Sequence, residues 1–118
     1  MSNVAQDCVL IANETAVALR DSFPVAEGHA LVVPRRNITS IYELQDGEYV
    51  EIWKLVSQVR GFLFERIRPD GFTIGVNDGQ AAGQTLPHAH IYVIPRQRGD
   101  VADPRGGIRW IIPDKATY

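Results

Sequence analysis

Two of the chain's three histidines, His88 and His90, stand two residues apart in an alternating segment that Pro87 and Pro95 bracket. Residues two apart in a strand point to the same face of a sheet. A strand from about 88 to 94 therefore places both histidines on one side together with Tyr92 and Ile94. The core side takes the alternating apolar residues, which are Ala89, Ile91 and Val93. Three ring-bearing side chains that can hydrogen-bond then line either solvent or a cleft.

The histidine pair by itself supports two other interpretations. Both rings can be half-exposed strand residues with no chemical role. They can also form an H-x-H metal site with His29 as a third ligand and zinc as the natural ion. However, no carboxylate-rich stretch of the kind that orients ligating histidines lies near them in the sequence.

The residues before the histidines favour phosphorus chemistry. A glycine-rich turn contains Gly79 and Gly83 and ends in Gln84 and Thr85, while Asn77 stands at the exit of the preceding apolar run. Such a turn can direct backbone N–H groups and neutral side-chain donors at phosphate oxygens. It resembles neither a Walker loop nor a Rossmann fingerprint, because the lysine and the G-x-G spacing are missing.

Apolar patterning predicts the elements that position these residues. Short apolar runs predict a hairpin over 9–12 and 15–19, a third strand over 29–33 and a fourth over 72–76. In the C-terminal tail, 110–112 is a further possible short strand.

The helical part of the chain has its own signals. Ser40 and Glu43 have capping-box spacing and predict a single helical turn. Asp46 is then the expected N-cap of the main helix, whose apolar residues recur at three- and four-residue spacings as far as Ile67. The elements together predict an α+β domain in which one antiparallel sheet packs on one long helix.

Length and composition limit the class of protein. The chain has 118 residues, 45% of them hydrophobic and 22% charged, which predicts a single globular domain over 1–118. A net charge of −2 gives no overall field for holding a nucleic acid or an anionic membrane. The single cysteine, Cys8, cannot form an intrachain disulfide, and the polar start Met1-Ser2-Asn3 does not read as a signal peptide. We therefore expect a cytoplasmic protein.

The segment 84–96 resembles the signature of the histidine triad family, in which three histidines alternate with apolar residues. The departure is Tyr92, which stands where the third histidine belongs. The resemblance also covers 21–25, 28–34 and 77–79, so it spans about 8–100 and leaves 97–118 as a tail. The flanks Pro95-Arg96 and Gly99-Asp100 look more like the fragile-histidine-triad side of the family, which hydrolyses dinucleoside polyphosphates.

The resemblance implies a fold, an activity and site residues. The fold is a five-stranded antiparallel sheet with one long and one short helix, in a homodimer. The activity is nucleotidyl hydrolysis or transfer at the α-phosphate of an adenine-nucleotide derivative, a dinucleoside polyphosphate or a nucleoside phosphoramidate, with no obligatory metal or other cofactor. His90 would form a nucleotidyl-histidine intermediate, with His88 and His29 supporting it. The implied phosphate and ribose contacts are Asn77, Gln84, Thr85 and Asp21.

Tyr92 opens an alternative. The family's third histidine donates a hydrogen bond to the phosphate or the leaving group as a cation, whereas a phenol donates only a neutral one at pH 7. The transferase branches of the family carry a neutral glutamine at this position, so a neutral donor is compatible with nucleotidyl transfer. The alternative is a nucleotide-binding or sensing protein whose catalysis Tyr92 weakens.

Overall fold

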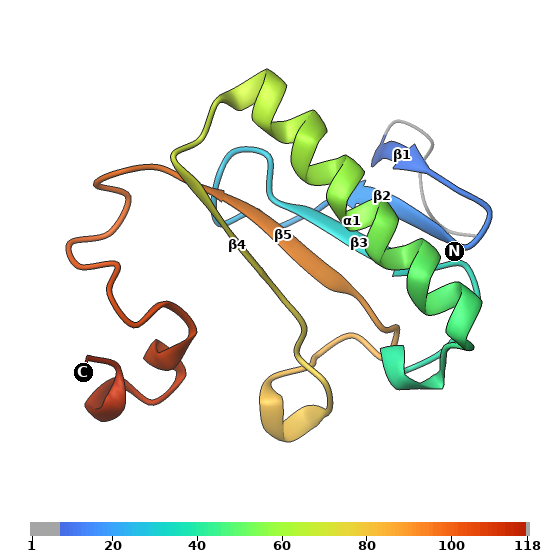
Figure 1. Cartoon of the computed structure of the whole chain (residues 1–118). Coiled ribbons are helices and arrows are strands. Elements are labelled where there is room, and N and C mark those ends of the chain that lie inside the picture. The colour runs from blue at the N-terminus through green and yellow to red at the C-terminus, as the bar shows by residue number, and fades with distance from the viewer. Residues whose placement is uncertain (1–7, 118) are drawn as a thin grey trace.

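One antiparallel sheet forms the centre of the structure, a computed structural model that describes residues 8–117. Its neighbouring strands follow the order β1-β2-β3-β5-β4, as Figure 1 shows. The strands are β1 (Val9–Ala12), β2 (Ala16–Arg20), β3 (Ala30–Pro34), β4 (Gly71–Gly75) and β5 (Ile91–Arg96). All four pairings are antiparallel. The predicted five-stranded antiparallel sheet is thus confirmed, while the polar start Met1-Ser2-Asn3 lies outside the described residues.

The main helix, α1 (Asp46–Ile67), follows a 3₁₀ turn at Ile41–Glu43. The capping box predicted for that turn is present, because the Ser40 hydroxyl accepts from Tyr42 N–H while the Glu43 carboxylate accepts from Ser40 N–H. The prediction that Asp46 is the N-cap of α1 is wrong by one residue. Gln45 takes that position, and the carboxylate of Glu48 accepts from its N–H at 2.9 Å, which holds the first turn.

The hydrophobic core lies between α1 and one face of the sheet (Figure 1). The helix contributes a stripe of buried residues at three- and four-residue spacings, namely Ile52, Leu55, Val56, Val59 and Leu63. The strands contribute alternate residues, and the ones with no exposed surface are Ala16, Ala18, Ala30, Val32, Ile91 and Val93. The residues between these point to the opposite face, which α1 leaves uncovered.

The tail after β5 folds differently from the prediction. The expected strand over 110–112 is wrong, because a 3₁₀ helix covers Gly107–Ile111 and a second one covers Pro113–Lys115. Gly106 and Gly107 have φ of 92° and 49°, which favour glycine and reverse the chain here. A Cβ at Gly106 would collide with the carbonyl oxygen of Ala116, so the tail closes tightly on itself. Across residues 8–117, no helix has both the length and the apolar character needed to cross a membrane.

Candidate active site

The uncovered face of the sheet carries a cavity of about 540 Å³. Five of the eight predicted site residues line it, which are Asp21, His29, Asn77, His90 and Tyr92. They come from four different strands or strand ends. Each stands at an alternate position whose side chain points to the uncovered face. The alternation read from 88–94 predicted this face for His90 and Tyr92. His90 and Arg96 both line the cavity. The extended chain between these two residues is about 20 Å long.

His90 has one ring nitrogen engaged and one available. Its Nδ1 lies 3.0 Å from the carbonyl oxygen of His88. A carbonyl can only accept, so Nδ1 must carry the proton and donate it. In the neutral ring, Nε2 then holds an unprotonated lone pair, and the ring lines the cavity. This tautomer is the one a nucleophilic imidazole needs.

His88 takes a different position from the one the strand interpretation gave it. β5 begins at Ile91, not at about His88, so the predicted start of this strand is wrong. The reason lies in β3, where Val32 pairs with Ile91 and the strand ends two residues later at Pro34, which has no N–H to extend the ladder. The His88 ring uses that end instead, since its Nε2 donates to the Pro34 carbonyl oxygen at 2.8 Å.

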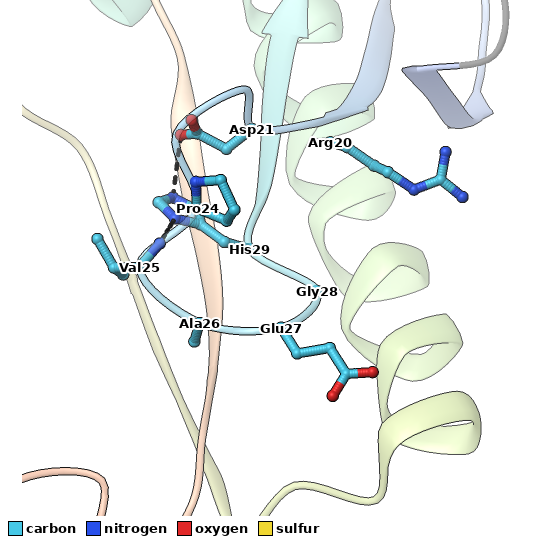
Figure 2. Close-up of a pocket in the computed structure, with 8 residues that line it drawn as sticks. All are labelled: Arg20, Asp21, Pro24, Val25, Ala26, Glu27, Gly28 and His29. Carbon is cyan, nitrogen blue, oxygen red and sulfur yellow. Dashed lines mark hydrogen bonds and ion pairs between the residues drawn. The ribbon is translucent and has the colours of Figure 1, made fainter.

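His29 is fixed on both sides of its ring, as Figure 2 shows. Its Nδ1 accepts from Val25 N–H at 3.1 Å, and its Nε2 lies 3.2 Å from Oδ2 of Asp21. Because Nδ1 accepts, the proton of the neutral ring is on Nε2 and is donated to the carboxylate. Burial lowers the pKa of His29, against the opposing charge of Asp21. The ring is therefore neutral at pH 7.

Asp21 also has a structural task beside its place in the cavity wall. Its Oδ1 accepts from Phe23 N–H at 2.8 Å, so the carboxylate organises the turn that presents the backbone of 24–28. A smaller cavity of about 380 Å³ lies against this turn, lined by the eight residues drawn in Figure 2. A carboxylate has lone pairs beyond these two contacts, so Asp21 keeps the capacity to accept from a ligand hydroxyl.

Tyr92 lies over a glycine on the neighbouring strand. Gly75 of β4 pairs with Tyr92 of β5, and a Cβ added at Gly75 would collide with the phenol oxygen and lie 2.8 Å from Cζ. Glycine is thus the residue that leaves room for this ring. Among the described residues, none hydrogen-bonds the Tyr92 hydroxyl, so the phenol can donate to a ligand in the cavity.

The other predicted contacts lie in the loop after β4. The Gln84 side chain holds this loop in place through three hydrogen bonds. Its oxygen accepts from Gly79 N–H, and its nitrogen donates to the carbonyls of Thr39 and Leu86. Gln84, the exposed Thr85 and His88 lie outside the residues that line the 540 Å³ cavity. Gln84 therefore sets the shape of the loop.

The sequence analysis missed two groups of residues in the cavity wall. The first group shares the uncovered face of the sheet with Ile94, which the alternation had predicted there, and consists of Leu31, Thr73 and Arg96. Parity with Tyr92 and its cross-strand partners is the signal that could have found them. The second group belongs to the tail and consists of Gly107, Ile108, Trp110 and Ile111. No local pattern places a tail segment opposite the sheet.

Arg96 is anchored at the far end of β5. Its guanidinium donates to both carboxylate oxygens of Asp100, at 2.6 and 2.9 Å, and to the Thr73 hydroxyl at 3.1 Å. The hydrogen bond from Arg96 is the main reason that the pKa of Asp100 falls to about 2. This ion pair holds the start of the tail against the sheet. Within residues 8–117, no group of three His, Cys, Asp or Glu side chains is arranged to hold a metal ion.

Solved structures share this architecture. The Caenorhabditis elegans NitFhit protein superposes with a TM-score of 0.80 and 31% identity, over 85% of this chain and 24% of that one. A hypothetical histidine triad nucleotide-binding protein from Sulfolobus tokodaii superposes with a TM-score of 0.75 and 30% identity, over 81% of this chain and 64% of that one. The five-stranded α+β fold and its site face thus define a histidine triad domain.

The sequence comparisons agree with the fold. The family model of the HIT domain matches residues 2–99, so the chain belongs to the HIT, or histidine triad, family. It is 33% identical over 97 residues to a bis(5'-adenosyl)-triphosphatase of Dictyostelium discoideum, covering 82% of this chain and 65% of that protein. The chain thus spans less than two thirds of the length of that relative. This relative and NitFhit confirm the predicted nearness to the fragile-histidine-triad side.

Proposed function

We propose that this chain is a nucleotidyl hydrolase or transferase that cleaves a dinucleoside polyphosphate or nucleoside phosphoramidate at the α-phosphate. The single observation that carries the proposal is the His90 tautomer, whose unprotonated Nε2 belongs to a ring that lines the cavity. Neutral imidazole is a competent nucleophile near pH 7. The names of relatives agree, since one is a bis(5'-adenosyl)-triphosphatase and another, from Schizosaccharomyces pombe, an asymmetrical bis(5'-nucleosyl)-tetraphosphatase.

The reaction proceeds in two displacements. Nε2 of His90 attacks the α-phosphorus, a P–N bond forms, and the bond from that phosphorus to the leaving group breaks. The ring becomes positively charged, and the hydrogen bond from Nδ1–H to the His88 carbonyl at 3.0 Å stabilises that charge. Water or another acceptor then attacks the phosphorus, the P–N bond breaks, and the acceptor's proton is released. Splitting one difficult displacement into two lowers the barrier of each.

The surrounding residues position the nucleotide. The carboxylate of Asp21 accepts from the ribose hydroxyls, and its hydrogen bond to neutral His29 fixes its direction. Asn77 donates to the phosphate from the cavity wall, while Gln84 and Thr85 present the loop backbone beside it. His88 holds the backbone of the histidine segment against Pro34. We propose no obligatory metal, since these donors are neutral side chains and backbone groups, and we propose a homodimer in the cytoplasm.

Tyr92 is the neutral donor to the leaving side. Its hydroxyl has no partner among the described residues and stands over Gly75, so it can donate to a departing phosphate oxygen. A polyphosphate leaves as a stable anion and does not require the proton that an imidazolium would give. The second candidate function, nucleotide binding without turnover, also rests on Tyr92, because the phenol supplies no cation.

The experiment measures AMP release from diadenosine tetraphosphate in the presence of a metal chelator. The unmodified chain should release AMP and ATP in equal amounts, and His90→Ala should reduce the rate by about 10⁴-fold or more. Mass spectrometry at neutral pH should detect an adenylyl adduct on the unmodified chain alone. Tight AMP binding without turnover, with activity restored in Tyr92→His, would favour the second candidate. Equal rates for the unmodified chain and His90→Ala would overturn the proposed mechanism.

A further inference from the structure

The strand register gives the first cavity, of about 540 Å³, a phosphate end and a nucleoside end. His90 directly precedes β5 and marks the phosphate end. The first residue of β3 pairs with Val93 of β5, so His29, which precedes β3, lies beside Ile94. The Asp21 N–H donates to the His29 carbonyl at 3.0 Å. Asp21, the proposed ribose contact, therefore belongs to the nucleoside end, four residues or about 13 Å along β5 from His90.

The tail closes the first cavity at its nucleoside end. Four tail residues line this cavity, namely Gly107, Ile108, Trp110 and Ile111. A second cavity, of about 490 Å³, lies between the tail and the end of β5. The two cavities share Arg96, Gly107 and Trp110. Arg96 comes two residues after Ile94, so the cavities meet at the nucleoside end, and Trp110 belongs to the wall of that end.

The tail holds Trp110 in a fixed orientation. The indole N–H donates to the Arg105 carbonyl at 2.9 Å. The guanidinium of Arg109 donates to the Lys115 carbonyl at 2.6 Å, which closes the segment that follows. The only polar group of the indole is therefore engaged, yet 46% of the residue remains exposed. Trp110 thus presents an aromatic surface whose ordering cost is already met within the tail.

The sheet presents an apolar surface to the same cavity. Leu31 of β3 and Ile94 of β5 both line it, and both are only partly buried. Leu31 pairs with Tyr92, so Ile94 is its diagonal neighbour on the uncovered face. A nucleobase is planar, with two apolar faces. Aliphatic side chains on the sheet and the indole of Trp110 on the tail can cover one face each, which removes both from water.

We propose that Trp110 stacks on the nucleobase of the nucleotide that is transferred to His90, so that the tail makes the site select nucleotides over base-free sugar phosphates. The inference rests on the proposed function, because it assigns a contact to the base of that substrate. Every base has an aromatic face, so this wall accepts any nucleobase. The contact is common to all substrates with the same transferred nucleotide, and Trp110 takes no part in bond breaking.

The first test compares a ligand that has a base with one that lacks it. In isothermal titration calorimetry, Trp110→Ala should raise the Kd for AMP about tenfold. The Kd for ribose 5-phosphate, measured by displacement of AMP, should stay within twofold. Trp110→Phe should recover most of the AMP affinity because it keeps an aromatic ring. Ile112→Ala is the matched control, since Ile112 is a 56% exposed tail residue that lines neither cavity. Equal losses for both ligands, or no loss for either, would overturn the proposal.

The second test detects the stacking itself. The chain has two tryptophans, so Trp53→Phe leaves Trp110 as the sole source of tryptophan emission. AMP should quench this emission in a saturable way, whereas ribose 5-phosphate should not. In Trp110→Phe the emission of Trp53 should not respond to AMP, because α1 lies on the other face of the sheet (Figure 1). Unchanged Trp110 emission at millimolar AMP would overturn the proposal.

Turnover separates this inference from the proposed function. Trp110→Ala should lower kcat/KM about tenfold for both diadenosine tetraphosphate and adenosine phosphoramidate and leave kcat within twofold, since the stacking is equal in the ground state and the transition state. A loss confined to diadenosine tetraphosphate would place the ring on the leaving half and overturn the inference. If the unmodified chain turns over neither substrate, the proposed function fails, while the two binding tests still decide the role of Trp110.

Discussion

The first cavity has two walls that are built in different ways. On the sheet side, each lining residue of β5 alternates with a residue packed in the core, and Ile91 and Val93 have no exposed surface. On the tail side, Trp110 and Arg109 donate to the carbonyls of Arg105 and Lys115, which are tail residues themselves, and Ile111 and Ile112 are 74% and 56% exposed. The strand ladder fixes positions to within the precision that bond making requires. The tail offers contact area that can vary without disturbing the core.

The largest expected effect concerns the sheet wall. Tyr92→Phe removes the hydroxyl that donates to the leaving side while keeping the ring over Gly75, so kcat should fall about 10–100-fold, the effect of losing one hydrogen bond to a charged leaving group. The matched control is Tyr42→Phe, because Tyr42 is a 72% exposed surface residue. Steady-state AMP release gives both rates. A Tyr92→Phe rate equal to that of the unmodified chain would show that the phenol only fills space.

Substitutions in the two walls should differ in their effect on the free energy of unfolding. Ile91→Ala removes a fully buried side chain from β5 and should lower the free energy of unfolding by about 2–5 kcal/mol. Ile112→Ala, in the exposed tail, should stay within about 0.5 kcal/mol of the unmodified chain. Urea denaturation followed by circular dichroism measures both. A large loss for Ile112→Ala would mean that the tail packs on the sheet more firmly than its exposure indicates.

Gly75→Ala tests whether the Tyr92 ring needs the space that Gly75 leaves open. The added methyl group collides with the phenol, so we expect a loss of about 1–3 kcal/mol in unfolding free energy together with lower activity. Gly71→Ala, in the same strand, meets nothing within 4 Å and serves as the control. In the Tyr92→Ala background the Gly75→Ala cost should largely vanish. A cost that persists there would place its origin in the backbone.

The smallest effect is a pH dependence at His29. Burial lowers its pKa in the folded state, so below its unfolded pKa of about 6.5 the unfolded chain binds more protons than the folded one. Stability should therefore fall as the pH drops below about 6.5, with a slope of at most about 1.4 kcal/mol per pH unit. His29→Gln should flatten the slope in urea titrations from pH 5 to 8. An unchanged slope in His29→Gln would assign the effect to another group.

The sequence predicted the parts of this molecule that follow from local pattern. Alternation along 88–94 put Tyr92 on the cavity side and Ile91 in the core, and the capping box at Ser40 placed the short helical turn. The family resemblance gave the five-stranded sheet and the fragile-histidine-triad side. Its assignment of roles to the site residues stays a prediction that the experiments above test.

The errors arose where distant residues decide the local structure. β5 starts at Ile91 because its partner β3 ends at Pro34. Pro34 is far from His88 in the sequence, so the residues around His88 give no sign of this end. The apolar run 110–112 became part of a 3₁₀ helix because the turn at Gly106 closes against Ala116. The role of Trp110 in the cavity wall depends on a tail that returns toward the sheet, and periodicity carries no information about such a return.

The pairing of β3 with β5 has a consequence for how the molecule folds. β1, β2 and β3 form one locally connected meander, and β4 and β5 form another unit. Within the sheet the two units join where β3 pairs with β5, at residues such as Val32 and Ile91. Closing that long loop carries the larger entropic cost, which favours its late formation. His29 and Leu31 lie on one side of this junction, and His90 and Tyr92 on the other. We expect AMP binding to appear only in the last kinetic phase of refolding, after most strand signal in stopped-flow circular dichroism, whereas simultaneous recovery would show that the junction forms early.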